Sequence, residues 1–399
     1  MLCNYNTEKL LGLKGVNVKN VRQLPDRTEI VLELPRKPHT CPCCGHQTNC
    51  VHDYRWQPVK DIPAFDKHTV LILRKRRYRC PHCGKRFFEK NSFLPRYYRM
   101  TSRLIAGILS RLADVRSFTS VAKEVNLSVS TVIRVFDCIS YGKPEQLPEV
   151  VSIDEFKGNT DGARYQCILT DPVHHRILDI LPTRYSHQLT KYFSPLDRSE
   201  TKYFVSDMWS TYASIAQTYF KDAVYVIDKY HYIRQVFWAF EAIRKEEQKK
   251  FSKTRRIYFK HSRVLLNKRY KFLTPDQKQQ VDLMLYASSR LLTAYSLKEQ
   301  FLNVLDSKDS ISARTALSQW ILLAQNSDLP KFSDCGDTMV RWSKGILNSF
   351  DCTYSNGFTE GINNKIKVLK RNAYGYRNFH RFRNRILHMF NHPSQKGAA

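Results

Sequence analysis

The sequence predicts a multidomain α/β protein, in which a cysteine-bearing domain and a helical domain precede an α/β domain with a long all-helical segment. Three observations support this prediction. Helical apolar spacing covers residues 101–136, short apolar runs follow between residues 150 and 227, and residues 230–346 again have a helical pattern. A chain of 399 residues is long enough for two or three such domains.

The composition favours a globular protein with a polyanionic partner. Hydrophobic residues make up 42% and charged residues 25%, as in ordinary globular proteins. The formal net charge of +29 attracts polyanions, so nucleic acid is the leading partner. We find neither an apolar stretch of about 18 residues nor an N-terminal signal, so no membrane partner and no export are expected. The eleven cysteines therefore favour bound metal in a reducing compartment over disulfides.

Two Cys-x-x-Cys-Gly motifs mirror each other in the first hundred residues. Each follows a strand-like run, Glu29–Leu34 before the first motif and Thr69–Leu73 before the second. A tight turn lets two thiolates face one cation, and two such turns complete a tetrahedral sulfur site suited to Zn²⁺. Protein ligands fill all four positions, so the site is expected to be structural. The expected ligands are Cys41, Cys44, Cys80 and Cys83.

Cys43 is an alternative ligand to Cys44. The spacing of Cys41 and Cys44 matches that of the second motif and puts Gly45 directly after the second ligand, which favours Cys44. Basic residues at 74–79 suggest contacts to phosphate. We expect the zinc-binding domain to span residues 1–98.

A helix-turn-helix is predicted within residues 99–142. Ser117 and Ser128 stand where helix N-caps are expected, and a turn at Asn126 separates two short helical stretches. The start of the second helix would enter the major groove. A generic helical hairpin has the same apolar spacing, but the positive charge of the chain favours DNA binding. The residues expected to contact DNA are Ser130, Thr131 and Arg134.

Five short apolar runs predict the sheet of the α/β domain. Val150–Phe156, Tyr165–Thr170 and Arg176–Leu181 are joined by short polar turns, which indicates an antiparallel meander. Tyr203–Val205 and Ala223–Ile227 alternate with helical stretches, which indicates parallel crossovers.

Three carboxylates stand out against this pattern. Asp154 interrupts a buried strand, where a charge needs a partner such as a metal, and Asp207 follows the fourth run, at the end of a strand where ligands gather. Glu360 lies early in a helix. Carboxylates from separate elements are the ligands that hold paired Mg²⁺ ions for phosphoryl displacement.

The helix of Glu360 has one apolar stripe and one polar face. Asn364, Lys367 and Arg371 follow Glu360 on the polar face, and no Asp or Glu occurs from Gly361 to the last residue. An acid followed by amide and cationic groups suits a helix that crosses a phosphate backbone beside a metal site. We expect these three residues to bind DNA.

Several segments resemble the DDE transposases of the ISL-three family of bacterial insertion sequences. The matching segments are Val151–Phe156, Val205–Trp209, Glu360–Lys367 and Ala373–Phe379. The resemblance covers nearly the whole chain, because that family also begins with a Cys-x-x-Cys zinc domain and a helix-turn-helix.

The resemblance implies a ribonuclease H-like catalytic domain over residues 148–399, with a helical insertion at about 235–345. It implies that Asp154, Asp207 and Glu360 bind catalytic Mg²⁺ or Mn²⁺. Asp228 and His231 match a further family motif, for which a structural hydrogen bond and a catalytic role both remain open.

The implied function is transposition of an insertion sequence. The protein would bind terminal inverted repeats and target DNA as double strands, cleave and join strands, and act as a homodimer or larger synaptic complex. The expected location is the bacterial cytoplasm, in association with the nucleoid. A zinc and helix-turn-helix DNA-binding regulator with an inert transposase-derived domain is the alternative, and a non-transposing nuclease of the same fold is a third possibility.

Overall fold

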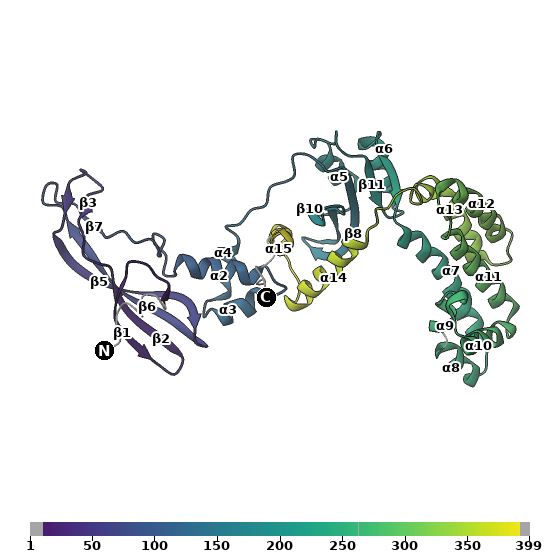
Figure 1. The fold of residues 1–399 in the computed structure, drawn as a ribbon, viewed down its shortest axis with the longest axis horizontal. Coiled ribbons are helices and arrows are strands. Elements are labelled where there is room, and N and C mark those ends of the chain that lie inside the picture. The colour runs from purple at the N-terminus through teal and green to yellow at the C-terminus, as the bar shows by residue number, and fades with distance from the viewer. Residues whose placement is uncertain (1–10, 262, 392–399) are drawn as a thin grey trace. The chain divides into compact units, whose positions relative to one another are not determined.

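The computed structural model describes residues 11–261 and 263–391, and the chain forms two compact units (Figure 1). The first unit runs to Tyr141 and also takes Lys367–Tyr376 and the chain from His380 onward. The second unit comprises Gly142–Ile366 and Arg377–Phe379. Helix α14 (Gly357–Asn372) therefore contributes its first turns to the second unit and its last turns to the first.

The sheet of the first unit has strand order β1-β2-β6-β5, and β7 pairs with β6. β2 and β6, which contain most of the two predicted runs, pair in parallel, and the other neighbours are antiparallel. Leu32, Leu71 and Leu73 are fully buried in its core. The strands are β1 (Asn17–Gln23), β2 (Arg27–Glu33), β5 (Val51–Ala64), β6 (Lys67–Arg79) and β7 (Arg86–Phe88), and β3 (His39–Thr40) pairs with β4 (Gln47–Thr48) outside this sheet.

Three short helices follow the sheet, and their caps are those that the sequence predicts. The Oγ atom of Ser117 accepts a hydrogen bond from the N–H of Ser120, and Ser128 accepts one from Thr131. Such caps satisfy backbone donors that the first turn leaves unpaired. The helices are α2 (Ser102–Leu112), α3 (Phe118–Glu124) and α4 (Val129–Phe136).

The helix α15 (Phe379–Asn391) contacts α2 and α4 within the first unit. The guanidinium of Arg385 is fully buried and donates hydrogen bonds to the carbonyls of Leu112, Asp114 and Arg116, the last at 2.9 Å. His388 lies 2.8 Å from the carbonyl of Leu109. Because a helix leaves its last carbonyls without partners, Arg385 serves as the C-terminal cap of α2.

The second unit contains a five-stranded sheet of order β10-β9-β8-β11-β12. The first three strands form an antiparallel meander, and β11 is parallel to both β8 and β12, as the apolar runs predict. This is the ribonuclease H-like arrangement. The strands are β8 (Val150–Thr160), β9 (Ala163–Asp171), β10 (Arg176–Leu181), β11 (Tyr203–Ser206) and β12 (Val224–Ile227).

Helices α5 (Ser186–Phe193) and α6 (Ser210–Tyr219) bury one face of this sheet. Val151 and Ile153 of β8 join their apolar core. Alternate residues of a strand point to opposite faces, so Ser152 and Asp154 lie on the other face.

The long helical segment forms a core of its own around the buried Trp320 (green in Figure 1). It starts after β12 and returns to that strand, since Asn348 donates to the carbonyl of Tyr225 on β12. The Ser349 hydroxyl also lies 3.0 Å from that of Tyr232 at the start of the segment, on α7. In the part of the chain that the structure describes, no helix is long and apolar enough to cross a membrane. The segment comprises α7 (Lys229–Lys250), α8 (Lys253–His261), α9 (Arg263–Asn267), η1 (Tyr270–Phe272), α10 (Pro275–Tyr286), α11 (Ser289–Val304), α12 (Ser310–Gln325) and α13 (Pro330–Asn348).

Replacing Arg385 by Met should destabilise the first unit, because three carbonyls near the end of α2 lose their donor. Each buried group left without a partner costs about 1–3 kcal/mol. Urea unfolding monitored by circular dichroism should therefore show an early transition that the wild type lacks. Arg377→Met, at an exposed position, is the matched control. Equal unfolding curves for the two variants would show that Arg385 is not an important cap.

Candidate functional site

Asp207 and Asp228 directly follow the parallel strands β11 and β12, and Asp154 lies within the neighbouring strand β8, just beyond the residues that pair with β11. β8 and β11 pair Ser152 with Val205, and β11 and β12 pair Ser206 with Ile227. Continuing this register brings Asp207 beside Asp154 on one side and Asp228 on the other. Ligands of α/β sheets gather at this carboxyl edge.

Asp154 is nearly buried and is held from two sides. Its Oδ1 accepts a hydrogen bond from the N–H of Glu155 at 2.7 Å, and its Oδ2 accepts one from Nδ2 of Asn363 on α14 at 2.9 Å. Burial raises the pKa of Asp154 to about 7 despite the Glu155 N–H, and the charge of Asp207 adds to the rise. A cation at this site would remove the penalty for ionising the carboxyl group.

Asp207 is half-buried, and its pKa is raised like that of Asp154. Burial and the negative charge of Glu155 raise its pKa to about 7, although the N–H of Trp209 and the guanidinium groups of Arg234 and Arg184 act in the opposite direction. Its Oδ1 is buried and accepts no hydrogen bond from the described residues.

The first turn of α14 is tied to the sheet at three points. The hydroxyl of Ser152 on β8 donates to the side chain of Asn356, which precedes the helix. Thr170 on β9 lies 2.8 Å from Thr359, hydroxyl to hydroxyl, and the third point is the carboxylate of Asp228.

These ties fix the position of Glu360. Its N–H donates to the carbonyl of Asn356 at 2.8 Å, so the helix begins at the anchored residue. Glu360 lies three residues before Asn363, and residues at this spacing are neighbours on one helix face. Because Asn363 bonds Asp154 directly, the half-buried Glu360 stands on the same face, one turn from that contact.

Asp228 makes the third tie and also has an unpaired oxygen. Its Oδ1 accepts the N–H of Asn356 at 2.9 Å, whereas its buried Oδ2 accepts nothing from the described residues and lies 4.0 Å from Nε2 of His231. Burial and then Arg234 lower the pKa of His231 to about 4, so the ring is neutral at pH 7. The hydrogen bond from Asn356 gives Asp228 a structural contact. A catalytic role of Asp228 and His231 remains a prediction.

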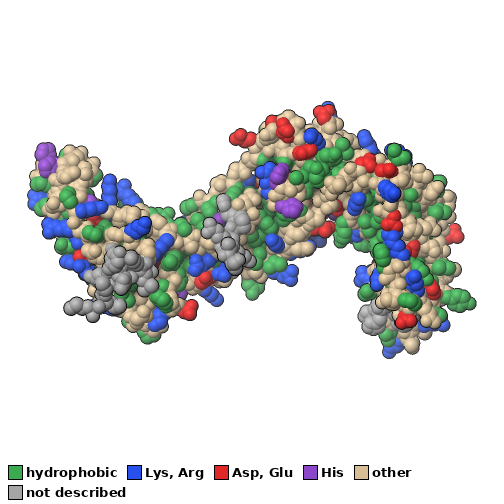
Figure 2. All heavy atoms as spheres, in the orientation of Figure 1, with side chains coloured by type: hydrophobic (Ala, Val, Ile, Leu, Met, Phe, Trp, Pro, Cys, Tyr) green, Lys and Arg blue, Asp and Glu red, His purple; other side chains and the backbone are tan. Residues whose placement is uncertain are grey.

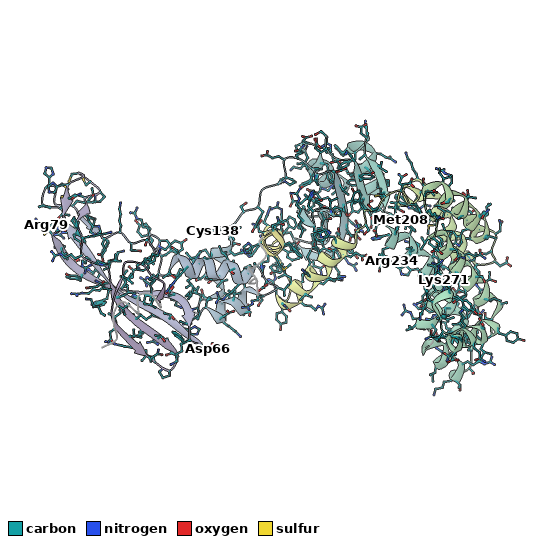
Figure 3. All side chains as sticks on the ribbon, in the orientation of Figure 1. Asp66, Arg79, Cys138, Met208, Arg234 and Lys271 are labelled. Carbon is teal, nitrogen blue, oxygen red and sulfur yellow. The ribbon has the colours of Figure 1, made fainter. Side chains whose placement is uncertain are left out.

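Arg234 is a site residue that the sequence analysis missed. Nη2 of Arg234 lies 3.3 Å from Nδ1 of His231, and its guanidinium lies 5.2 and 4.6 Å from the ring centres of Tyr230 and Trp238 (α7; Arg234 and Met208, next to Asp207, are labelled in Figure 3). Both rings are more than half exposed. The spacing of Tyr230, Arg234 and Trp238 at intervals of four residues is a signal that could have identified this helix face.

The carboxylate oxygens at the strand ends have the chemistry of a hard cation site. Carboxylate oxygens are ligands that Mg²⁺ prefers, and the unpaired buried oxygens of Asp207 and Asp228 are available to a cation. These carboxylate oxygens lie farther apart than the sulfur atoms of the cysteines. Within residues 11–261 and 263–391, the sulfur cluster is the only group of at least three ligand atoms that all lie within 4.8 Å of one another.

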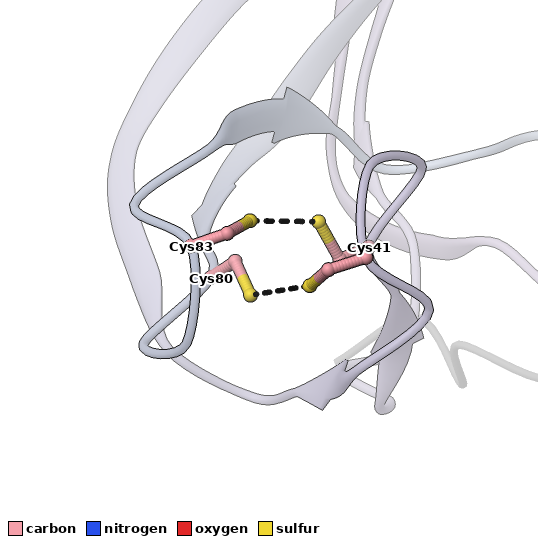
Figure 4. Close-up of side chains that lie close together, drawn as sticks. Cys41, Cys80 and Cys83 are labelled. Carbon is pink, nitrogen blue, oxygen red and sulfur yellow. Dashed lines mark hydrogen bonds between the residues drawn. The ribbon is translucent and has the colours of Figure 1, made fainter.

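The four predicted cysteines form this sulfur cluster (Figure 4). The Sγ atoms of Cys41 and Cys83 are 3.6 Å apart, and those of Cys44 and Cys80 are 3.5 Å apart. Gly45 and Gly84 follow the two motifs with φ values of 73° and 72°, which suits glycine. Four thiolates at these separations have the chemistry of a structural zinc site, and Cys43 lies outside the cluster, which supports the choice of Cys44 as the expected ligand.

The residues expected to contact DNA are accessible, but their role remains a prediction. Ser130 and Arg134 are exposed on α4, and the hydroxyl of half-buried Thr131 accepts a hydrogen bond from Arg134 at 3.4 Å. Lys and Arg side chains are spread over the face of the first unit drawn in Figure 2. On α14, the exposed residues are Asn364, Lys367 and Arg371.

Comparisons with known families cover most of the chain. A family described as "Transposase", the DDE domain of the ISL3 type, matches residues 151–386. The "zinc-finger of transposase IS204/IS1001/IS1096/IS1165" matches residues 37–93, and the "Helix-turn-helix domain of transposase family ISL3" matches residues 89–138.

Three individual relatives match this chain over different lengths. The "Transposase for insertion sequence element IS1001" of Bordetella parapertussis is 30% identical over 391 residues, 94% of this chain and 96% of that protein. A "Transposase for insertion sequence element IS1557" of Mycobacterium tuberculosis is 24% identical over 54% of each chain. An "ATP-dependent protease" of Lactococcus lactis is 34% identical, but over only 29% of this chain and 40% of its own length. The zinc cluster, the helix-turn-helix and the ribonuclease H-like domain occur here in one chain in the same order, and the chain belongs to the ISL3 family of DDE transposases.

Proposed function

We propose that this transposase binds the terminal inverted repeats of its insertion sequence and catalyses metal-dependent DNA strand cleavage and strand transfer. The observation that carries the proposal is the carboxyl edge of the sheet. There two buried carboxyl groups with pKa values near 7 adjoin the helix that bears Glu360. Such a cluster is costly in an apolar core and is suited to a pair of divalent cations.

In this proposal Asp154, Asp207 and Glu360 hold Mg²⁺ or Mn²⁺. The bound ions supply Lewis-acid activation of the attacking oxygen and stabilise the leaving oxygen of an in-line displacement. Asn363 orients the carboxylate of Asp154 through its amide, and Arg234 offsets the negative charge of Asp207. Water attacks the phosphodiester at the element's end, and the released 3′-hydroxyl then attacks target DNA.

DNA recognition is assigned to the first unit and to the polar face of α14. Ser130, Thr131 and Arg134 on α4 contact the terminal repeats, and the exposed residues Asn364, Lys367 and Arg371 contact the DNA backbone. We propose that the zinc-binding, helix-turn-helix and catalytic domains have the bounds predicted above. Two ends must be joined, so the active species is a homodimer or a larger synaptic complex.

The central test is an assay with a labelled duplex taken from the DNA that flanks the gene. With Mg²⁺ or Mn²⁺, the wild type should cleave the duplex and join it to a second DNA. Asp154→Asn should bind the duplex equally well but cleave it at least roughly 100-fold more slowly. This is the order of loss when a key electrostatic contact at the reacting group is removed. Tight binding without cleavage by the wild type would instead favour a DNA-binding regulator, and cleavage without joining would favour a nuclease.

The pH dependence of stability provides a test that needs no DNA. Asp154 and Asp207 have pKa values near 7 in the folded, metal-free protein, against a normal value of 3.8. The folded state therefore binds more protons between pH 4 and 7, so the two groups reduce stability progressively as pH rises through this window.

Asp154→Asn removes one of these penalties. At pH 8 without divalent metal, the variant should melt about 2–4 °C or more above the wild type, and the difference should narrow toward pH 5. Added Mg²⁺ should raise the melting temperature of the wild type but not of the variant. Asp222→Asn, at an exposed carboxylate, is the control and should leave both measurements unchanged. A destabilised Asp154→Asn protein at pH 8 would contradict the assignment.

The zinc cluster should be separable from the catalytic site. Replacing Cys80 and Cys83 by Ser should abolish zinc binding, measured by mass spectrometry, and should weaken binding to the element's ends by at least about tenfold, because the chain around residues 37–93 loses its crosslink. Mg²⁺ should still raise the melting temperature of the second unit. Cys43→Ser changes a residue outside the cluster and should keep the zinc. Loss of zinc from this variant would contradict the ligand set.

A further inference from the structure

A cleft of about 600 Å³ lies within the first unit, between the recognition helix α4 and strands β5 and β6. Its size is in the range of small-ligand pockets. Val70 and Val135 contribute apolar surface, and none of the described residues that line it is acidic. Cys138, labelled in Figure 3, follows α4 and also lines the cleft. The polar and aromatic lining consists of Lys60, Tyr97, Tyr98, Arg99, Thr131 and Arg134.

The two walls of the cleft are fixed to each other. The N–H of Lys60 on β5 donates to the carbonyl of Arg99, and the N–H of Thr101 donates back to Lys60. The buried carboxylate of Asp61 accepts hydrogen bonds from the Thr101 hydroxyl at 2.6 Å and from the Arg103 guanidinium. Lys60 also donates to the carbonyl of Asn126 in the turn before α4. The cleft is therefore a built feature of the unit.

Tyr97 has a conformation that folding alone does not explain. Its φ of 67° is in the left-handed region, which is unfavourable for a bulky side chain. Its ring is 88% exposed, so burial does not compensate for this strain. The guanidinium of Arg96 lies 4.7 Å from the ring centre and covers one side. Strain retained at an exposed aromatic residue is typical of a binding site.

The chemistry of the cleft matches a nucleotide. Tyrosine rings offer stacking surfaces to any base, and cations beside them bind phosphate, as in proteins that bind unpaired nucleic acid. Lys60, Arg99 and Arg134 supply the cations. Thr131 and Arg134 belong both to this lining and to the residues that we assign to DNA contact, so the cleft opens where the duplex would lie.

We propose that this cleft accepts a nucleotide that is turned out of the duplex bound by α4, with its base stacked on Tyr97. The proposal rests on DNA binding by the helix-turn-helix and not on strand cleavage. A nucleotide displaced from a duplex loses stacking and pairing, and the rings and cations of the cleft replace part of both.

The test places 2-aminopurine, which brightens when unstacked from its neighbours, at successive positions of a terminal-repeat duplex. Divalent metal is omitted rather than chelated, because a chelator would also remove the zinc. With the wild type, fluorescence should rise several-fold at one position. Tyr97→Ala should lose this rise and bind the duplex about tenfold more weakly. Tyr97→Phe should keep the fluorescence rise and the wild-type affinity.

Two further variants separate binding from folding. Tyr97→Gly removes the ring but tolerates the positive φ, so it should melt at or above the wild-type temperature and still lose the fluorescence rise. Tyr286→Ala, at a 92% exposed tyrosine on α10, should behave as the wild type. A duplex that binds with no rise at any position, or a rise that persists in Tyr97→Ala, would overturn the proposal alone. Failure of the wild type to bind any duplex would overturn both this proposal and DNA recognition by the helix-turn-helix. A loss of strand cleavage would contradict only the proposed catalytic activity.

Discussion

The anchoring of α14 is the constraint on which the catalytic unit depends. Between β12 and this helix the chain makes a long helical excursion, so sequence proximity cannot position Glu360. The position comes instead from hydrogen bonds between Asn356 and two strands, reinforced by Thr359 and Asn363. Because the helical segment leaves and rejoins the sheet at the same strand, it can be large without displacing the helix that follows it.

These contacts compensate the buried acids at the carboxyl edge only in part. Asp154 and Asp207 are unfavourable as charges in an apolar sheet, and the protein retains them with few compensating donors. Asp228 is partly compensated because it anchors α14, and His231 is held neutral beside it. A folded protein that leaves such groups unsatisfied sacrifices stability there, and this is the place where we propose that divalent cations bind.

Local signals in the sequence predicted most of the elements. The serine caps of α3 and α4, the short apolar runs of the sheet and the paired Cys-x-x-Cys-Gly turns each depend on residues within a few positions of one another. Asp154 could be predicted because a charge in an apolar strand is visible in the sequence itself. The contact of Asn363 with Asp154 spans 209 residues, and that of Arg385 with Leu112 spans 273, so no local pattern encodes them. Arg234 was missed for a different reason, since arginine on a long basic helix resembles an ordinary solvated residue.

Because Arg385 is buried against residues near α2, the packing of the first unit depends on a part of the chain that is synthesised late. The helix-turn-helix match covers residues 89–138, yet the guanidinium that completes α2 comes from α15, which ends at Asn391. The ribosome must therefore synthesise and release α15 before this unit can reach its final packing. Chains that stop before α15 lack this guanidinium, so every chain that completes this unit also carries the intervening sheet with Asp154 and Asp207.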